Sequence, residues 1–443
     1  MTDRSQRSVP GRPPGFFYRQ TKRGLLRGKG PLVLQCEDVP LPKLAEKYGT
    51  PLYVYSTASI EERYRLFDRA FRDVPHTVCY SVKANSNLSV LRLLARRGCG
   101  FDVVSGGELE RVLAAERKAV KKVVFSGVGK TREELTAALR AGILLFNVES
   151  ESELWTLAEC AGRLHAVAPM ALRVNPDVAA ETHPYISTGL HKHKFGVPIG
   201  EARALYAKAS GTRYLKVRGV SVHIGSQITD ASPFGEAMSR VADLVRELRR
   251  DSHRVDYVDA GGGLGITYET SQSTEFPERV AAYARALAGP LRALDVHLLL
   301  EPGRSIIGPA GVLLTSVIYK KMNNGKRFLI VDAAMNDLIR PALYNAYHQI
   351  VPVTRLSGGS DQIETTDIVG PVCETGDFFA RDRELPPVEE GALLAILDTG
   401  AYGMVLSSNY NTRPRPAEVL VSGKSAKVIR RRELMSEILQ AEK

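Results

Sequence analysis

The chain lacks the features of a secreted, membrane-bound or disulfide-stabilised protein. Its 443 residues contain no apolar run close to the roughly 20 residues that span a bilayer, and no charged start followed by an apolar segment marks a secretory signal. Cysteines are few and scattered without a CxxC pair, at Cys36, Cys79, Cys99, Cys160 and Cys373. This spacing argues against a disulfide framework or a zinc site. We expect most of these cysteines to be buried and the protein to be soluble and cytoplasmic.

Acidic residues are almost absent from the first thirty positions. Eight basic residues lie there against Asp3 alone, so this segment carries most of the net charge of +11. A basic, Pro- and Gly-rich segment is typical of a solvated tail, and the alternatives are a nucleic-acid-binding arm or an organellar targeting segment. We interpret residues 1–30 as a flexible basic arm and expect neither a membrane nor a nucleic acid as partner.

Short apolar runs alternate with helical stretches from residue 50 to 305, which is the pattern of βα units around a parallel sheet. The candidate strands end near Lys83, Ser105, Gly127, Glu149, Asn175, His223, Gly261 and Glu301. About eight such units in about 250 residues are the dimensions of a (β/α)8 barrel, which we place at 51–308. A helix is predicted over 232–250, where apolar residues recur at spacings of three and four.

After residue 310, helical periodicity is weak and β-branched runs are separated by turn signals. Examples are VLLTSVIY at 312–319 and AEVLVSG at 417–423. This pattern predicts an antiparallel β domain, barrel-like or sandwiched, over 309–443, and we expect residues 31–50 to join it. The predicted fold class is therefore an α/β barrel followed by an all-β domain.

Lys83 ends the apolar run of the first barrel strand, in the sequence YSVKAN. Barrels of this kind carry their chemistry at the C-terminal ends of the strands. A desolvated lysine with a lowered pKa is a nucleophile that forms Schiff bases. Considered by itself, such a lysine is more often one that extends along the barrel rim into solvent.

Three further motifs follow later strands. The run GGGLG at 261–265 lies after the seventh strand, where such barrels bind phosphate, although glycine runs also form simple tight turns. The run EPGR at 301–304 offers a carboxylate and a guanidinium, for which a structural ion pair is the alternative. His223 supplies a flat ring after the sixth strand, and a lone histidine is otherwise a satisfied core residue. A lysine, a phosphate loop and a carboxylate together meet the needs of pyridoxal phosphate.

With these motifs the chain resembles the fold-type III, alanine-racemase-like pyridoxal phosphate decarboxylases, and among them the diaminopimelate decarboxylase family. The resemblance covers residues from about 40 to 435, and its motifs together are highly specific. They are YSVKANSN (80–87), FDVVSGGE (101–108), HIGSQ (223–227), GGGLG (261–265), EPGRS (301–305), MNDLIRPALY (335–344), GPVCETGD (370–377) and GAYG (400–403). The chain departs from the family at Ser81, where alanine is frequent, and in the basic arm, neither of which is a catalytic position.

The resemblance implies a site for pyridoxal 5′-phosphate. Lys83 would form the Schiff base, His223 would stack on the ring, and Glu301 would face the pyridine nitrogen. Ser226, Gly263 and Tyr402 would help to hold the phosphate. The expected cofactor-binding residues are Lys83, His223, Ser226, Gly262, Gly263, Glu301, Pro302, Gly303, Arg304 and Tyr402.

The resemblance also implies that the substrate is meso-2,6-diaminopimelate. The expected substrate-binding residues are Arg304, Arg340, Tyr344, Glu374 and Tyr402. Arginine suits the carboxylate of the distal centre because its guanidinium pairs bidentately with such groups. Cys373 corresponds to the family's proton donor, so Lys83 and Cys373 are the expected catalytic residues. In this family Cys373 and Glu374 come from the partner subunit, which implies a homodimer with shared active sites.

The implied reaction is decarboxylation at the D-centre of the substrate, which yields L-lysine and CO2 as the last step of lysine biosynthesis. One alternative is a decarboxylase of the same fold that acts on ornithine, arginine or carboxynorspermidine. Decarboxylases of basic amino acids need an acid where this chain has Arg340 and Tyr344. Further alternatives are a non-catalytic pyridoxal phosphate carrier, which usually lacks the β domain, and a nucleic-acid-binding role for the basic arm.

Overall fold

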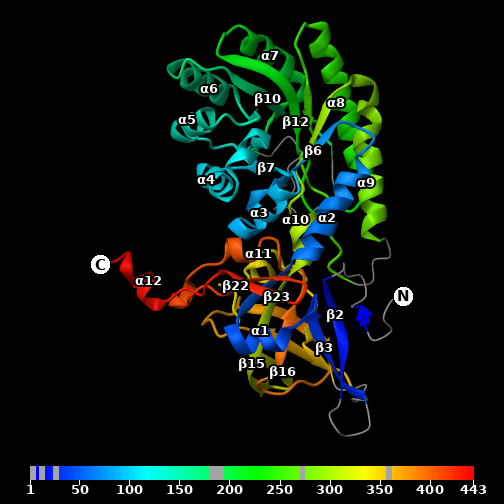
Figure 1. Cartoon of the computed structure of the whole chain (residues 1–443), viewed down its shortest axis with the longest axis vertical. Helices are drawn as coiled ribbons and strands as arrows, with labels where there is room; N and C mark the ends of the chain where they lie inside the picture. The colour runs from blue at the N-terminus through cyan, green and yellow to red at the C-terminus, as the bar shows by residue number, and fades with distance from the viewer. Residues whose placement is uncertain (1–5, 9–14, 23–28, 179–193, 270–274, 356–361) are drawn as a thin grey trace. The chain divides into compact units, whose positions relative to one another are not determined.

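The structure is a computed structural model that describes residues 6–8, 15–22, 29–178, 194–269, 275–355 and 362–443 (Figure 1). Contacts within the chain divide it into two compact units, each with a hydrophobic core of its own. The barrel unit comprises Arg63–Ile266 and Thr274–Ser305. The β unit comprises Met1–Glu62, Thr267–Ser273 and Ile306–Lys443.

Eight parallel strands form the barrel of the first unit. They are β6 (His76–Ser81), β7 (Gly100–Val103), β8 (Val123–Phe125), β9 (Leu145–Val148), β10 (Ala168–Asn175), β12 (Leu215–Val222), β13 (Tyr257–Asp259) and β14 (His297–Leu300). Their order is β10-β12-β13-β14-β6-β7-β8-β9, and a β9–β10 pairing closes the ring. The short strand β11 (Val197–Pro198) pairs with the end of β10. The predicted barrel is confirmed, and each strand ends within two residues of its predicted position.

Helices follow the strands around the barrel. They are α3 (Leu88–Arg96), α4 (Gly106–Ala115), α5 (Arg132–Ala141), α6 (Glu151–Arg163), α7 (Ala202–Ser210), α8 (Ser232–Arg250) and α9 (Phe276–Leu291). Figure 1 shows α4 to α7 along one flank of the strands and α8 and α9 along the other. The helix α8 has the predicted bounds, and its apolar stripe is buried. None of the described helices combines the length and apolar character needed to cross a lipid bilayer.

Hydroxyl side chains explain how a helix starts soon after a strand ends. Ser105, Thr131 and Ser150 each accept a hydrogen bond from the backbone N–H three residues later, at the start of α4, α5 and α6. Such caps satisfy backbone donors that have no partner within the helix. The loops that lead into these three helices are therefore short and well defined. Two helices cross the unit boundaries, α2 (Thr57–Ala70) and α10 (Arg304–Ile307).

Two sheets build the β unit. The larger contains β5 (Leu52–Ser56), β15 (Gly311–Asn323), β16 (Lys326–Val331), β17 (Ile350–Pro352), β19 (Glu364–Val369), β20 (Phe378–Leu385), β21 (Leu393–Ile396), β22 (Ala417–Ser422) and β23 (Ser425–Arg430). The smaller contains β1 (Gln6–Ser8), β2 (Phe16–Lys22), β3 (Lys29–Cys36), β4 (Val39–Pro40) and β18 (Thr354–Arg355). The helices of this unit are α1 (Leu41–Tyr48), α11 (Arg340–Tyr344) and α12 (Met435–Gln440).

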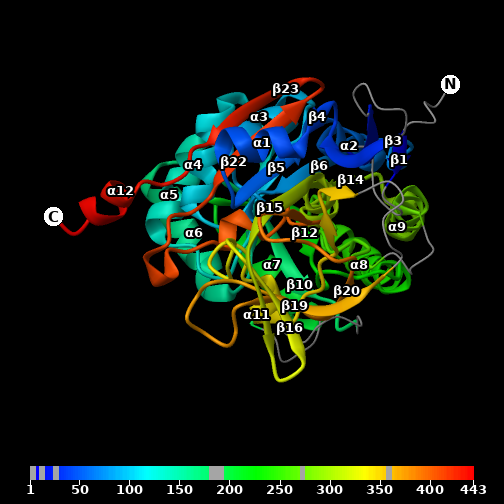
Figure 2. The ribbon, with the colours of Figure 1, turned by 90° about the horizontal axis from the view of Figure 1, so that it is seen from below.

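The larger sheet corrects two expectations. The strand β5 was expected within a barrel beginning at residue 51, but it pairs with β15 and β22 of the β unit. Figure 2 shows β5 beside β22, although the two strands are far apart in sequence. All five residues of β5 are buried, so it has the composition of a barrel strand. The β5–β22 and β16–β19 pairs are parallel, so the sheet is mixed rather than antiparallel.

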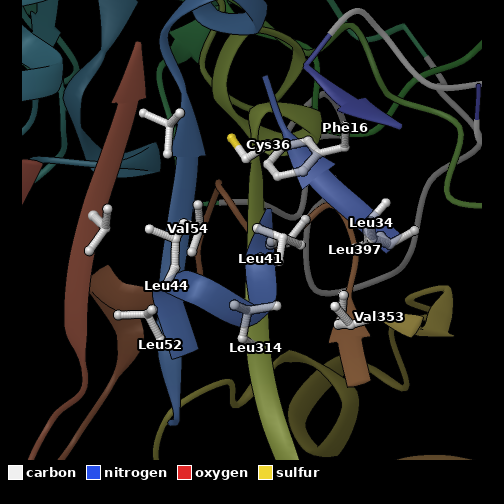
Figure 3. Packing of buried hydrophobic residues seen from close by; sticks show 14 of the residues in the cluster. Phe16, Leu34, Cys36, Leu41, Leu44, Leu52, Val54, Leu314, Val353 and Leu397 are labelled. Atoms are coloured by element: carbon white, nitrogen blue, oxygen red, sulfur yellow. The ribbon is translucent and has the colours of Figure 1, made fainter. Parts of the chain in front are cut away.

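Part of the first thirty residues belongs to the folded β unit. The strand β2 pairs with β3, and Phe16 and Tyr18 lie in a hydrophobic cluster with Leu34 and Cys36 (Figure 3). The expectation of a flexible arm is therefore wrong for 16–22. Alternate residues of this strand face the core, a pattern that the surrounding basic residues obscure in the sequence. Residues 1–5, 9–14 and 23–28 of the predicted arm lie outside the described residues.

Truncation of Phe16 tests this assignment. Phe16 is only 3% exposed, so Phe16→Ala should lower the free energy of unfolding by about 3–5 kcal/mol, because a buried aromatic side chain leaves a cavity. Its neighbour Phe17 is partly exposed, and Phe17→Ala should cost less than about 1 kcal/mol. Urea denaturation followed by circular dichroism measures both. Equal, small effects would show that β2 does not contribute to the core.

Candidate active site

Lys83 lies at the C-terminal mouth of the barrel, in the 3₁₀ turn Val82–Ala84 directly after β6. Its Nζ atom is 3.3 Å from Oδ2 of Asp102 in β7, and its side chain is 40% exposed. The Ser81 hydroxyl donates to the same carboxylate oxygen at 2.7 Å. Asp102 itself is fully buried. The lysine amine is thus oriented by a buried acid while it stays accessible to a ligand.

Pro302 and Gly303 hold this turn against the end of β14. The backbone N–H of Ser81 donates to the carbonyl oxygen of Pro302 at 3.2 Å. A Cβ atom at Gly303 would lie 2.9 Å from Cβ of Ala84 and 3.1 Å from Cβ of Ser81. Glycine is therefore needed at position 303 for the close approach that brings Lys83 to the last barrel strand.

Asp259 and Glu301 form a buried, hydrogen-bonded pair of carboxyl groups at the ends of β13 and β14. Burial raises the pKa of Asp259 to about 6. Burial, followed by the charges of Asp102 and Asp259, raises the pKa of Glu301 well above its usual range. Two such carboxylates are too close to be ionised together, so the pair holds a proton, and Glu301 donates it to Asp259.

Neighbouring polar groups hold the Asp259–Glu301 pair in place. Asn147 Nδ2 donates to Asp259 Oδ2 at 2.6 Å, and the backbone N–H of Gly261 donates to Oδ1 at 3.0 Å. The Ser126 hydroxyl donates to Glu301 Oε1 at 3.2 Å. Each bond comes from a strand end or from the glycine loop, so the barrel itself fixes the orientation of the two acids.

His223 is partly buried and neutral beside the glycine loop. The backbone N–H of Gly262 donates to its Nδ1 atom at 3.2 Å, so the ring proton of the neutral form is on Nε2. Burial lowers the pKa of His223 well below its usual value, and the charges of Arg173 and Lys83 lower it further. Arg173 is itself fixed by Glu149 at 3.0 Å.

The glycine loop packs backbone against backbone. Gly263 has a φ of +109°, and a Cβ atom there would lie 2.5 Å from the carbonyl oxygen of Gly225. A Cβ atom at Gly262 would lie 2.2 Å from the carbonyl oxygen of Glu301. Arg304 Nη2 donates to Ser226 Oγ at 3.2 Å, so a hydroxyl and a guanidinium lie together at this side of the mouth. Hydroxyl, guanidinium and glycine-rich backbone are groups that bind phosphate.

This donor set fits pyridoxal phosphate. The charge of Lys83 acts on both His223 and Glu301, so the amine, the neutral ring and the proton-bearing acid lie at one mouth. The three parts of the cofactor each have a matching group: the amine of Lys83 for the aldehyde, the buried acid Glu301 for the pyridine nitrogen, and the glycine loop with Ser226 for the phosphate. The barrel unit thus contains Lys83, His223, Ser226, Gly262, Gly263, Glu301, Pro302, Gly303 and Arg304 of the residues predicted from the sequence.

The β unit contains the other predicted residues: Arg340, Tyr344, Cys373, Glu374 and Tyr402. Arg340 begins α11 and is buried, with its Nη1 atom 2.8 Å from His348 Nε2. Its guanidinium lies 5.0 Å from the ring centre of Tyr268. Tyr344 ends the same short helix and is partly buried. Tyr402 is a non-glycine residue with a φ of +55°, which marks a constrained turn.

Cys373 and Glu374 lie on an exposed loop. Cys373 is exposed, whereas the other four cysteines are buried as predicted. The Tyr410 hydroxyl donates to Glu374 Oε2 at 2.7 Å, and the backbone N–H of Cys373 donates to Asn411 Oδ1 at 3.2 Å. Asp377 anchors the loop, since its carboxylate accepts hydrogen bonds from the backbone N–H groups of Val372 and Met335.

Several polar residues around these sites were missed at the sequence level. In the barrel they are Asp102, Ser126, Asn147 and Asp259, and in the β unit they are Tyr268 and His348. The barrel residues had a detectable signal, because each is a polar residue at or near the end of an apolar run, as in GFDVVS and VDYVDAGG. Tyr268 and His348 had no such signal, since their role depends on contact with Arg340.

Comparisons with known proteins agree with this geometry. Residues 57–308 match the family described as pyridoxal-dependent decarboxylase, pyridoxal binding domain. The chain is 52% identical to a diaminopimelate decarboxylase of Pseudomonas aeruginosa over 92% of this chain and 96% of the relative. It is 51% identical to that of Vibrio cholerae over 91% of this chain and 95% of the relative.

Solved structures give the same result. The structure of diaminopimelate decarboxylase from Helicobacter pylori complexed with L-lysine has a TM-score of 0.86 and 40% identity, over 91% of this chain and 99% of that chain. The fold and site are those of a pyridoxal-dependent enzyme. The chain belongs to the pyridoxal-dependent decarboxylases, and within them to the diaminopimelate decarboxylase family.

Asp259→Asn should change the pH dependence of stability of the cofactor-free protein. The pKa of Asp259 is about 6 when folded and has a usual value of 3.8, so between these values the folded chain binds a proton that the unfolded chain releases. The resulting stabilisation is present below about pH 4 and is lost as the pH rises through about 6. The variant should show a weaker decline, which melting temperatures from pH 4 to 7 measure. Part of the decline should remain, because burial also raises the pKa of Glu301.

Asp256→Asn is the matched control, because Asp256 lies just before the same strand and its pKa is lowered by Arg254 and Arg218 against the opposing effect of partial burial. Asp256 is ionised in the folded state and, above about pH 5, in the unfolded state as well, so its replacement should leave the decline between about pH 5 and 7 unchanged. A constant difference in melting temperature between wild type and Asp259→Asn at every pH would contradict the shared proton.

Proposed function

We propose that this protein decarboxylates meso-2,6-diaminopimelate at its D-centre and releases L-lysine and CO2, the last step of lysine biosynthesis. The observation that carries the substrate is the 52% identity to the Pseudomonas aeruginosa enzyme over 92% of this chain. The complex of the Helicobacter pylori relative with L-lysine is consistent with the product. The buried guanidinium of Arg340 also favours a substrate with a distal carboxylate over ornithine, arginine or carboxynorspermidine.

The barrel unit holds the cofactor. When bound, pyridoxal phosphate supplies an electron sink for the bond that loses CO2. Lys83 provides the amine for covalent attachment, and His223 packs against the ring. Glu301 keeps a proton available for the pyridine nitrogen. Ser226, Gly262, Gly263 and Arg304 hold the phosphate.

The substrate is held at its retained end, which supports loss of the other carboxylate. In the β unit, Arg340 and Tyr344 bind the carboxylate of the L-centre, and Glu374 binds its amino group. Tyr402 completes the substrate contacts. A guanidinium whose orientation is already restricted in the folded protein loses less entropy on binding, which increases affinity and positions the D-centre for reaction.

Cys373 donates the proton that replaces the lost carboxylate. The exposed thiol and its anchored loop support a role outside the core of its own chain. By the family pattern, Cys373 and Glu374 act in the site of a partner subunit, so the active form is a homodimer with two shared sites. Reprotonation from water restores the thiol after each turnover.

The purified holoenzyme should release equimolar CO2 and L-lysine from meso-diaminopimelate and little CO2 from ornithine or arginine. A coupled assay for CO2 and chromatography of the amino acids measure this. In parallel, Lys83→Ala should lose turnover and the visible absorbance of covalently bound cofactor, because the Schiff-base amine is absent. Preferential release of CO2 from ornithine would refute the proposed substrate, and an unchanged spectrum of Lys83→Ala after dialysis would refute the attachment site.

Subunit complementation tests the shared site. Lys83→Ala and Cys373→Ala, each inactive alone, should together regain up to about a quarter of wild-type activity after random exchange. Half of the dimers are then mixed, and one of the two sites in each mixed dimer combines an intact Lys83 with an intact Cys373.

Two controls make the complementation result decisive. Mass spectrometry of differently tagged chains establishes that exchange occurred. The double variant Lys83→Ala/Cys373→Ala, mixed with an equal amount of wild type, should lower the activity by about half on exchange, because both sites of each mixed dimer then lack one residue, whereas sites formed by one chain would keep their activity. Exchange without recovery of activity would show that Lys83 and Cys373 serve the site of the same chain.

A further inference from the structure

His348 of the β unit has both ring nitrogens engaged in a defined way. Its Nδ1 atom is 2.7 Å from the carbonyl oxygen of Leu397, and its Nε2 atom is 2.8 Å from Arg340 Nη1. A carbonyl oxygen only accepts, so Nδ1 carries the proton. A guanidinium only donates, so Nε2 accepts. The geometry alone therefore requires a neutral imidazole in one tautomer, oriented with its acceptor toward Arg340.

The surroundings of His348 keep this arrangement rigid. His348 is fully buried, and Arg383 Nη1 donates to its backbone carbonyl oxygen at 2.9 Å. The ring of Tyr268 packs edge-to-face on His348 with ring centres 5.3 Å apart. The same tyrosine ring lies 5.0 Å from the Arg340 guanidinium. Arg340 is thus held by a hydrogen bond on one side and by an aromatic face on another.

We infer that His348 is a positioning residue that fixes the Arg340 guanidinium for the carboxylate that the substrate retains. The inference rests on the proposed function, in which Arg340 binds that carboxylate. An arginine side chain loses rotamer entropy when a ligand orders it, so a guanidinium fixed before binding makes its bidentate pair at a smaller entropic cost. Stability alone requires only the bond from Nδ1 to Leu397, because that bond satisfies the buried carbonyl group.

Two amide variants separate positioning from a structural role. In His348→Asn the short amide places a donor near the former Nδ1 atom, so the bond to Leu397 is kept and the acceptor for Arg340 is lost. In His348→Gln the longer amide places its oxygen near the former Nε2 atom, so the acceptor for Arg340 is kept. If His348 has only a structural role, His348→Asn should retain more of the wild-type affinity for L-lysine than His348→Gln. If His348 positions Arg340, His348→Gln should retain more of it.

The probes are L-lysine and cadaverine, which is lysine without its carboxylate. Binding of each to the holoenzyme is measured by titration of the cofactor's visible absorbance. His348→Asn should weaken L-lysine binding about tenfold or more, because a buried donor loses its acceptor, while cadaverine binding changes less than about threefold. His348→Gln should recover a large part of the lysine affinity. Arg340→Ala sets the maximal loss, and the KM for meso-diaminopimelate should follow the same order.

His297→Asn is the matched control. His297 lies at the start of β14, hydrogen-bonded to Thr77 Oγ1 at 2.8 Å, and its replacement should leave the ratio of the two affinities unchanged. The inference would be overturned if His348→Asn kept the wild-type ratio of L-lysine affinity to cadaverine affinity, or lost affinity for both probes equally. Loss of bound cofactor in both His348 variants would overturn it as well, because it would show a general role in folding. If the wild type itself fails to bind L-lysine and releases no CO2 from meso-diaminopimelate, the proposed function fails first.

Discussion

The barrel mouth depends on one electrostatic constraint, which is that buried carboxyl groups must share protons or receive hydrogen bonds. Oδ2 of Asp102 accepts a hydrogen bond from Ser81 and pairs with Lys83, while Asp259 and Glu301 share a proton. A buried carboxylate without such partners would cost several kcal/mol. This requirement explains why an accessible lysine amine and a proton-bearing acid lie at the same barrel mouth. Pyridoxal phosphate needs both groups.

Close packing of backbone makes this electrostatic arrangement possible. Glycines at 262, 263 and 303 let the segments at the ends of β6, β12, β13 and β14 approach to distances at which any side chain would clash. The approach brings Gly262 to His223 and Pro302 to Ser81. The strand ends are therefore rigidly linked, and a rigid scaffold is what a cofactor site needs to hold reacting groups in register.

In the β unit, neighbouring groups also hold a buried charge in place, here the guanidinium of Arg340. Arg340 is buried, and a neutral histidine acceptor and an aromatic face both contact its guanidinium. A neutral acceptor orients the guanidinium without adding a negative charge of its own. Tyr410 fixes Glu374 in a comparable way on the exposed loop that carries Cys373. Both clusters keep a functional charge in a defined orientation.

The sequence by itself determined the eight barrel strands and the side chains at their ends, because period, composition and glycine positions are local properties. Lys83, His223 and Glu301 were recognisable for that reason. Only the tertiary structure decided that β5 pairs with β22, that residues 16–22 join the core, that Glu301 shares a proton with Asp259, and that His348 accepts from Arg340. Strand partners and proton positions depend on which distant groups are buried together, and local propensity carries no information about that.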